Sequence, residues 1–467
     1  MSLIIPANSA SATGGYQVAN SCRFDGTSAY LSRTQGTPTD IDKYTISVWF
    51  KRSALFNGSY QNIIGTDHQS VREAIRFNDD ADSLTWDFKN ASNTKSNITP
   101  NQLFRDVASW YNLVCIFDSA NGTANLRRRI FLNGTEITSF AAVTYNAQNE
   151  DGNLNKGGQN IVIGIPAAAN NFFSGYMSEF VFVDGQALTP DGNFGEFDED
   201  SGIWKPIDVS GLTFGNNGFY LDFEDSANLG NDANGGTDFT ETNLTAIDQS
   251  TDTCTNNFAT WNPLFRKGTT TPAFTEGNLK STFDDGGANE FALTTFGVSA
   301  GKWYAEVKWT SNTGTAATAT GILDMAYSGT ADPNDSVTNA FGYFGSGTKN
   351  VSGTASSYGD SYADGDIIGI AIDMDNNKLY FSKNGTFQNS GDPTTGSTGT
   401  GAIGIVAGVT YGIFATDYNN QVAELNTGSP AFAISSGNTD GNGYGNFEYA
   451  VPSGYYSLNT KNLAEYG

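Results

Sequence analysis

The sequence predicts an all-β protein with two sandwich domains in tandem, and three observations support this. Aromatic residues make up 13% of the 467 residues and glycine is abundant, whereas the helix formers leucine, lysine, arginine and glutamate are scarce. No segment keeps a 3.6-residue apolar repeat for longer than about two turns. A chain of this length also exceeds what one hydrophobic core usually serves, so two domains are expected.

The clearest local pattern is a hairpin between Asp364 and Gly385. Apolar residues alternate along Ile367–Met374 with the period of two that is typical of a strand. Asp375-Asn376-Asn377 tolerates the positive φ of a tight turn, and Asn384-Gly385 is a second turn signal. An earlier segment, residues 110–134, repeats this plan and ends in its own Asn-Gly pair. The repetition predicts the same architecture in both halves, and the aspartates of the later hairpin are expected at turns and edges.

Residues 1–20 are polar and small, which predicts an extended N-terminal arm. Short strands with turn signals every dozen residues or so follow, as in a sandwich or jelly roll. Within Tyr44–Lys51, Ile46, Val48 and Phe50 share one face. Further strands of the first domain are expected at 62–64, 74–77, 84–88, 113–117, 130–132, 161–163, 177–183 and 218–223.

Charge and cysteine content exclude several classes of protein. The formal charge of −25 argues against nucleic-acid binding, which needs clustered basic residues. The dense basic run Arg127-Arg128-Arg129 is interpreted as charge protection of a strand edge. Cys22, Cys115 and Cys254 are too far apart for a disulfide framework or a metal motif, so we expect buried reduced thiols. No secretory signal is recognisable, and no segment approaches the ~20 apolar residues of a membrane span.

Both halves resemble known families. The segments SCRFDGTSAYLSRT, YTISVWFKRS, SWYNLVCIFDSANG, RRIFLNGTEI and NNFFSGYMSEFVFVDGQALT occur in the order of a laminin G-like module. From Ser21 to about Pro190 the chain thus resembles this member of the concanavalin A-like lectin/glucanase superfamily. GKWYAEVKW, the 364–385 hairpin and AELNTG follow the pattern of a SPRY domain, a second concanavalin A-like sandwich. The resemblance implies tandem jelly-roll sandwiches at 21–227 and 255–467, joined by a polar linker at 228–254.

A further resemblance concerns the connector that begins FGEFDEDSGIWKPIDVSG and ends ATWNP, residues 194–263. It is similar to a connector in structural proteins of marine, cyanophage-like tailed phages, and YAVPSGYYSLNTKNL near the C-terminus resembles the same chains. This implies a virion structural protein, a tail fibre, spike or capsid decoration, assembled in the host cytoplasm. Host-surface glycans and other virion proteins are the implied partners. Residues 1–20 would attach by strand addition, a homo-oligomer is expected, and membrane insertion is not.

Candidate catalytic sets are sparse, so we expect no enzyme. His68 is the one histidine, and any Ser-His-Asp site would have to use it. Glu196, Asp198 and Asp200 have the alternate spacing that glycosidases with two carboxylates need, but glycines bound the segment and favour a solvated acidic loop. A glucanase-type carbohydrate-active enzyme is the alternative function. A cellular adaptor that binds a peptide through its SPRY half is a third.

Two kinds of binding site are predicted. Calcium is the one cofactor that the laminin G-like resemblance allows, at a sandwich rim rich in the hard oxygen ligands that the ion prefers. Its candidate ligands are Asp79, Asp80, Asp82 and Asp118. Aromatic residues beside glycine and serine could stack on sugar rings, although they could equally plug the ends of the sandwiches or make subunit contacts. These residues are Phe172, Phe173, Tyr176, Tyr343, Phe344, Tyr358 and Tyr362.

Overall fold

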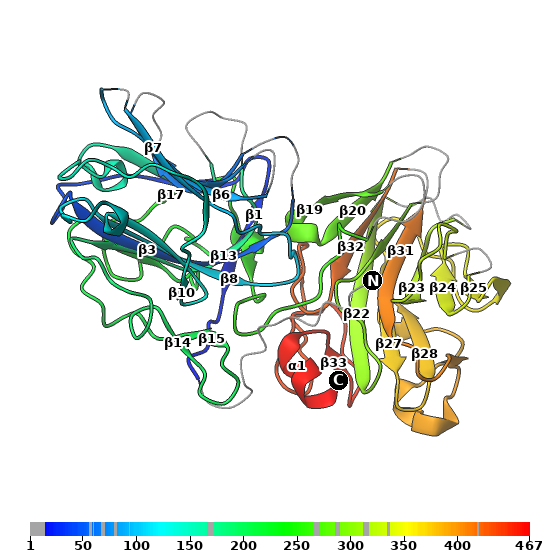
Figure 1. Cartoon of the computed structure of the whole chain (residues 1–467). Helices are drawn as coiled ribbons and strands as arrows, with labels where there is room; N and C mark the ends of the chain where they lie inside the picture. The colour runs from blue at the N-terminus through cyan, green and yellow to red at the C-terminus, as the bar shows by residue number, and fades with distance from the viewer. Residues whose placement is uncertain are drawn as a thin grey trace. The chain divides into compact units, whose positions relative to one another are not determined.

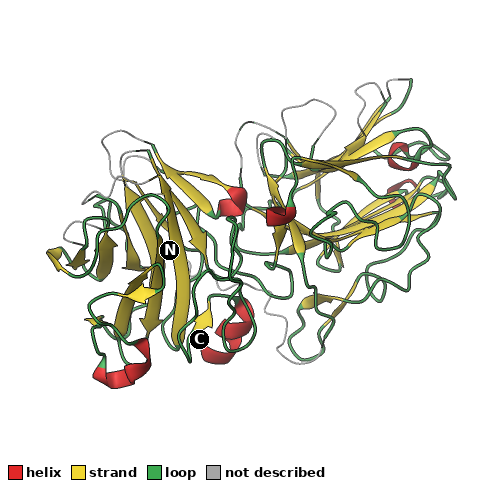
Figure 2. Ribbon diagram, turned by 180° about the vertical axis from the view of Figure 1, so that it is seen from behind, coloured by secondary structure: helices red, strands yellow, loops and turns green. Residues whose placement is uncertain are grey.

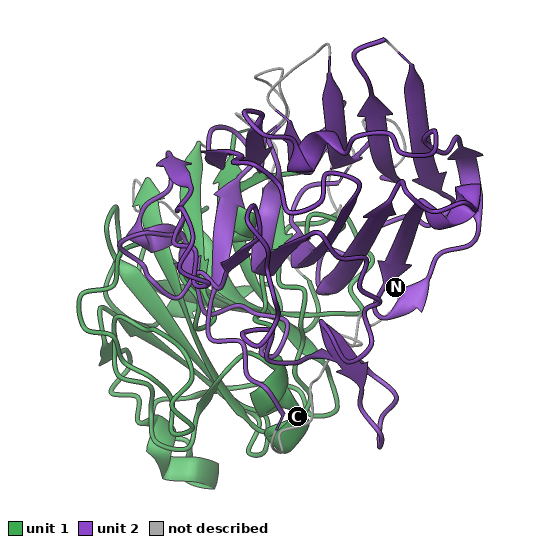
Figure 3. Cartoon of the chain, turned by 90° about the vertical axis from the view of Figure 1, so that its left-hand side faces the viewer, with its two compact units in different colours: residues 1–12, 257–467 green, residues 13–256 purple. Residues whose placement is uncertain are grey.

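The computed structural model describes residues 15–55, 58, 60–66, 71–78, 82–92, 94–165, 172–265, 271–284, 290–311, 317–333, 337–417 and 420–467. These residues form two compact units, and the boundary between the units in the sequence lies between Asn256 and Asn257 (Figure 3). Strands dominate both units, and the predicted all-β class is confirmed (Figure 2).

The first unit stacks two antiparallel sheets, each with eight strands in the described part of the chain (Figure 1). Sheet A runs β10 (Thr135–Glu136), β9 (Arg128–Leu132), β8 (Tyr111–Asp118), β3 (Lys43–Arg52), β13 (Ser174–Asp184), β1 (Ser21–Asp25) and β18 (Gln249–Ser250), with β16 (Phe219–Leu221) beside β13. Sheet B runs β11 (Phe140–Val143), β7 (Lys95–Pro100), β6 (Leu84–Lys89), β5 (Arg72–Phe77), β4 (Gln61–Thr66), β12 (Asn160–Ile163), β2 (Tyr30–Thr34) and β17 (Thr240–Thr242).

The alternation predicted along β3 builds the core between these sheets. Ile46, Val48 and Phe50 point inward and belong to one buried cluster with Ile75 and Trp86 from sheet B. Burying such side chains contributes about 1.5–3 kcal/mol each before entropy is counted. Each strand predicted for this unit overlaps an observed one.

Residues 228–254, expected to form a linker, belong to this first sandwich. Leu229, Phe239 and Leu244 lie in its core. β17 pairs with β2 and β18 with β1, so the segment extends both sheets. Its few apolar residues show no periodicity, and their burial depends on the sheet edges that they cover. The division between the units therefore lies after Asn256.

The second unit also stacks two sheets. Sheet C runs β19 (Ala273–Thr275), β20 (Lys280–Phe283), β32 (Gln421–Asn426), β22 (Lys302–Ser311), β27 (Ile367–Asp373), β28 (Lys378–Lys383) and β29 (Thr386–Phe387), with β30 (Ile403–Gly404) beside β28 and β33 (Tyr456–Ser457) beside β22. Sheet D runs β21 (Glu290–Leu293), β31 (Tyr411–Asp417), β23 (Ala319–Asp324), β24 (Ala340–Phe344), β25 (Thr348–Val351) and β26 (Thr354–Ser357). The sheets face each other, since the rings of Tyr343 from sheet D and Phe381 from sheet C lie 5.6 Å apart.

The hairpin predicted at 364–385 is formed by β27 and β28. It lies inside sheet C, and its outer face is covered as well, because Ala371 and Tyr380 pack against Phe447 and Tyr455. Asp373 is a turn residue as expected, because its carboxylate accepts from the backbone and side chain of Asn376. The expectation that it lies at an edge was wrong, since it pairs with Lys302 on one side and Lys378 on the other. Its side chain is fully buried, and its carboxylate forms an ion pair with Lys302 at 3.1 Å.

The interpretation of the basic run at 127–129 as edge protection does not hold for Arg128, although β10 pairs only with Phe131 and Leu132 of β9 and does not reach the basic run. The strand period sends Arg128 into the core, where only 1% of the residue is exposed. There its guanidinium donates to the Trp86 carbonyl at 2.6 Å and lies 4.3 Å from the centre of the Trp86 ring. Burial lowers the pKa of this guanidinium.

Helix is confined to short segments of the described chain. The α-helix α1 spans Thr460–Tyr466, and 3-10 turns occur at Ala124–Leu126, Asn153–Asn155, Ala246–Asp248, Glu276–Asn278 and Pro393–Thr398. None of the helices in these ranges has the length and apolar character that crossing a bilayer requires. The three cysteines are buried free thiols, as predicted.

Candidate functional site

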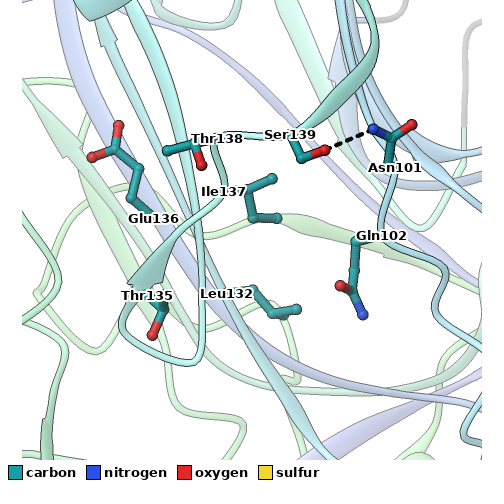
Figure 4. A pocket seen from close by; sticks show the side chains of 8 residues that line it. All are labelled: Asn101, Gln102, Leu132, Thr135, Glu136, Ile137, Thr138 and Ser139. Carbon is teal, nitrogen blue, oxygen red and sulfur yellow. Dashed lines mark hydrogen bonds between the residues drawn. The ribbon is translucent and has the colours of Figure 1, made fainter.

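An open pocket of about 440 Å³ lies at one edge of the first sandwich, where the chain crosses from sheet A to sheet B (Figure 4). Residues 137–139 make this crossing between β10 and β11, and the residues that follow β7 form the opposite wall. The volume is within the range of small-ligand sites. The lining residues are Asn101, Gln102, Leu132, Thr135, Glu136, Ile137, Thr138 and Ser139.

The predicted turn at Asn133-Gly134 shapes the β10 side of the pocket. Both residues have positive φ, +46° and +75°, as a tight two-residue hairpin turn requires. The Asn112 backbone N–H donates to Asn133 Oδ1 at 2.8 Å and ties the turn to β8. A Cβ on residue 134 would lie 2.4 Å from Trp204 Cε3, so glycine allows the turn to pack directly on the indole.

The floor of the pocket is apolar and its walls are polar. Figure 4 shows the half-buried Leu132 and Ile137 between Gln102 on one side and Thr135 and Glu136 on the other. Amide and hydroxyl groups each offer donors and acceptors. The arrangement presents hydrogen-bonding groups around a surface that can cover the C–H face of a ligand.

The single carboxylate of the pocket is held in place by a bidentate ion pair. Arg129 Nε and Nη2 donate to the two oxygens of Glu136 at 2.8 and 2.6 Å. These hydrogen bonds raise the pKa of Arg129. Asn101 Nδ2 donates to Ser139 Oγ at 2.8 Å and joins the two walls. The pocket therefore presents little uncompensated charge, which suits a neutral polyhydroxylated ligand.

The aromatic residues predicted as ligand contacts are mostly interior. Tyr343, for example, is fully buried and accepts a 2.7 Å hydrogen bond on its carbonyl from the Tyr362 hydroxyl. The others with exposures of 7% or less are Phe173, Tyr176, Phe344, Tyr358 and Tyr362. Phe172 alone among the seven is half-buried, with its ring 6.5 Å from that of Tyr30. Six of the predicted rings are thus buried, and Tyr176 lies with Trp49 and Trp110 in a cluster separate from the core between the two sheets.

The acidic segment considered for glycoside hydrolysis forms a separate hairpin, β14 (Gly195–Phe197) and β15 (Trp204–Pro206). Lys205 Nζ lies 3.2 Å from both Glu196 and Asp198. Asp198 also accepts from the backbone and hydroxyl of Ser201, and these hydrogen bonds, with Lys205, lower its pKa to about 2. A general acid must carry a proton at its working pH, which Asp198 does not.

Four other carboxyl groups of the described residues have raised pKa values, a property that can mark catalytic acids, and Glu179 and Glu306 are two of them. Burial raises the pKa of Glu179 to about 8, and both Tyr16 and Tyr220 donate to its Oε2. Burial raises the pKa of Glu306 to about 7. Glu306 accepts from Tyr304, from Asn426 and from the backbone N–H groups of residues 448 and 449. Both groups are enclosed, and their hydrogen bonds join separate segments of the chain.

The calcium candidates do not converge in the described residues. Asp82 is 4% exposed and pairs with Arg52 at 3.1 Å, while Arg105 lies 3.4 Å from its other oxygen. Asp118 accepts a long hydrogen bond from Asn121. No group of three metal-binding side chains occurs within the described ranges. Asp79 and Asp80 lie outside them, as do His68 and the arm before Gly15, so calcium binding stays a prediction.

Sequence reasoning missed the pocket because its walls come from segments about thirty residues apart in two different sheets. The available signals were local: the turn at 133–134, and the polar residues Thr135, Thr138 and Ser139 that follow it. Neither indicates that Asn101 and Gln102 lie opposite.

Comparisons with known proteins agree with this architecture. A family model for the concanavalin A-like lectin/glucanases superfamily matches residues 25–192, and a model for the SPRY domain matches residues 302–410. None of the curated proteins that were compared matches the chain.

Similar solved structures cover one unit or part of the chain. A heptameric SAP-like pentraxin from Limulus polyphemus is 16% identical, with 38% of this chain and 80% of that chain covered and a TM-score of 0.28. A human SPRY domain is 16% identical, with 34% and 94% covered and a TM-score of 0.24. A protein from Bacteroides ovatus proposed to bind carbohydrate is 18% identical, with 49% and 59% covered and a TM-score of 0.29. The family models show that the chain contains a concanavalin A-like lectin/glucanase domain followed by a SPRY domain.

Proposed function

We propose that the protein is a non-enzymatic virion structural protein of a tailed phage, and that the pocket of its first sandwich binds a neutral saccharide of the host surface. The observation that carries the binding role is the pocket itself: amide and hydroxyl groups of Asn101, Gln102, Thr135 and Thr138 surround an apolar floor. A sugar ring has the same division into hydroxyl groups and an apolar C–H face.

The state of the acidic residues supports binding rather than hydrolysis. A two-carboxylate mechanism needs one protonated acid and one free carboxylate on either side of the scissile bond. Glu196 and Asp198 share the ammonium of Lys205 instead. The buried carboxyl groups of Glu179 and Glu306 accept hydrogen bonds inside the folded units, Glu179 from the Tyr220 hydroxyl and Glu306 from the Tyr449 backbone N–H.

The virion role rests on the resemblance of residues 194–263 and 449–463 to phage structural chains. Under this role the protein is a fibre, spike or decoration protein, its partners are other virion proteins, and it assembles in the host cytoplasm, as a homo-oligomer. Residues 1–20 would supply the attachment strand. Calcium at Asp118 is retained as a proposed ligand of the first sandwich.

A saccharide array tests the binding role with the full chain. We expect wild-type protein to bind a set of neutral glycans, and Gln102→Ala together with Thr135→Ala to weaken this binding at least about tenfold, since each buried polar contact contributes about 1 kcal/mol or more. Gln148→Ala is the matched control, because Gln148 is also an exposed glutamine of the first sandwich. Equal binding by both variants would refute the assignment of the pocket.

The virion role has its own test. Mass spectrometry of purified phage particles should detect this chain at a fixed copy number relative to the capsid protein. Its absence from intact particles would refute that role and leave the saccharide test unaffected.

A further inference from the structure

The β14–β15 hairpin extends from the first sandwich as a two-stranded sheet that pairs with neither of the large sheets (Figure 1). Such a hairpin is only marginally stable by itself. Trp204 provides the anchor: it is 4% exposed, and its Nε1 donates to Asn112 Oδ1 at 3.0 Å. Gly134 and Gly195 both lie against its indole, where a Cβ on either would come within 2.6 Å. The base of the hairpin is therefore fixed on sheet A.

The exposed side of this hairpin carries a large aromatic ring. Phe197 is 47% exposed, among the highest values for large apolar side chains in the described residues. Its ring packs edge-on against Trp204, with the centroids 5.0 Å apart. This contact holds the ring in one orientation, so that a partner would lose little entropy in covering it. Rigid, partly exposed aromatic residues are typical anchors of protein interfaces.

Carboxylates flank this residue in the sequence, and two of them lie with Lys205 on the other face of the hairpin. Glu196, Asp198, Glu199 and Asp200 accompany it in a five-residue stretch, and Lys205 pairs with the first two of them. Glu199 and Asp200 are exposed at the tip. The tip is well formed, because Asp198 Oδ1 accepts from the backbone N–H groups of Asp200 and Ser201 at 3.2 and 2.9 Å.

We infer that this hairpin, residues 195–206, is a docking element for a different protein with a basic surface and an apolar recess for Phe197. Charge complementarity selects this occupant. A second copy of the chain, with a formal charge of −25, would bring like charge to the tip. With a basic partner, Phe197 would form the apolar centre of the interface, and the carboxylates of the tip would meet opposite charges at its rim. An apolar centre with a polar rim is the usual arrangement of a specific interface.

The inference is independent of saccharide binding but rests on the proposed virion role, so it is tested by crosslinking once mass spectrometry has found the chain in purified particles. Phe197 is replaced by the photoreactive residue p-benzoylphenylalanine in the full chain, and the assembled particle is irradiated. We expect one crosslinked protein other than this chain, joined at a peptide rich in lysine and arginine. Absence of a crosslink, a crosslink to a second copy, or a crosslink to an acidic peptide would overturn the inference.

The crosslinked protein is then purified and its binding to the full chain is measured. Phe197→Ala should weaken binding by about tenfold or more, the effect typical of an anchor residue. Glu199→Gln with Asp200→Asn should slow association at low salt, since rim charges act mainly on the association rate. Ile247→Ala is the matched control, because Ile247 is 42% exposed elsewhere on the same unit. Equal effects of Phe197→Ala and Ile247→Ala would also overturn the inference.

Discussion

Replacement of Asp252 tests whether the connector is an integral part of the first sandwich. Lys51 on β3 and Asp252 form an ion pair at 2.8 Å, and each side chain is 1% exposed. Trp110 Nε1 donates to the other oxygen of Asp252 at 3.0 Å. At an effective dielectric constant of ~20, two charges at 2.8 Å attract by about 6 kcal/mol. Desolvation of the two ions offsets much of this attraction.

Asp252→Asn keeps the shape of the side chain and removes the charge, which leaves the Lys51 ammonium buried without this carboxylate. We expect it to lower the free energy of unfolding by about 3–5 kcal/mol. Adding Lys51→Met should recover most of the loss, because the double variant has no buried charge at this site. Asp151→Asn is the control: its pair with Lys156, at 3.3 Å, is about half exposed on both sides, and its loss should cost about 1 kcal/mol or less.

Urea unfolding of the full chain, followed by hydrogen exchange and mass spectrometry, reports on each unit separately. Peptides from β1 and β3 should show the loss, and peptides from the second unit should not. If Asp252→Asn costs no more than Asp151→Asn, the connector is not held in the first sandwich and the reasoning fails.

Two further predictions concern the core and the pocket. Burial raises the pKa of Glu306 to about 7 from 4.5, so the folded state holds a proton that the unfolded state releases; stability should fall by up to about 3 kcal/mol as pH rises from about 4.5 to about 7. Glu306→Gln should flatten this part of the profile in urea titrations at several pH values, and an unchanged profile would contradict the assignment. Gly134→Ala should destabilise by more than about 1 kcal/mol in thermal unfolding, since φ is +75° and the new Cβ would meet Trp204. Gly122→Ala, where a Cβ meets nothing within 4 Å, should have little effect, and similar midpoints for the two would refute the packing argument.

Local periodicity was sufficient to predict part of the strands. The alternation in Tyr44–Lys51 and the turns at Asn133-Gly134 and Asn384-Gly385 are properties of a few consecutive residues, and each is observed. Arg128 shows the limit of such reasoning. Its burial follows from the same strand period, but only the contact with Trp86 of sheet B shows that this face is covered.

The connector and the candidate site depended on contacts that are distant in sequence. In the sequence, Phe239 is an apolar residue within a polar stretch. It lies in the core because β17 pairs with β2. The aromatic residues next to glycine were predicted to lie on loops and contact a ligand, but Tyr343 lies between two sheets. The pocket requires Gln102 and Ile137 to meet across the edges of both sheets. None of these pairings leaves a periodic signal.

The fate of a bound saccharide tests the central claim, that the protein binds glycans without cleaving them. The full chain is incubated with each neutral glycan that it retains on the array, and the glycan is then analysed by mass spectrometry. The account predicts an intact glycan and retention that depends on Gln102. Shortened products that disappear in Glu196→Gln would contradict it and establish a glycosidase.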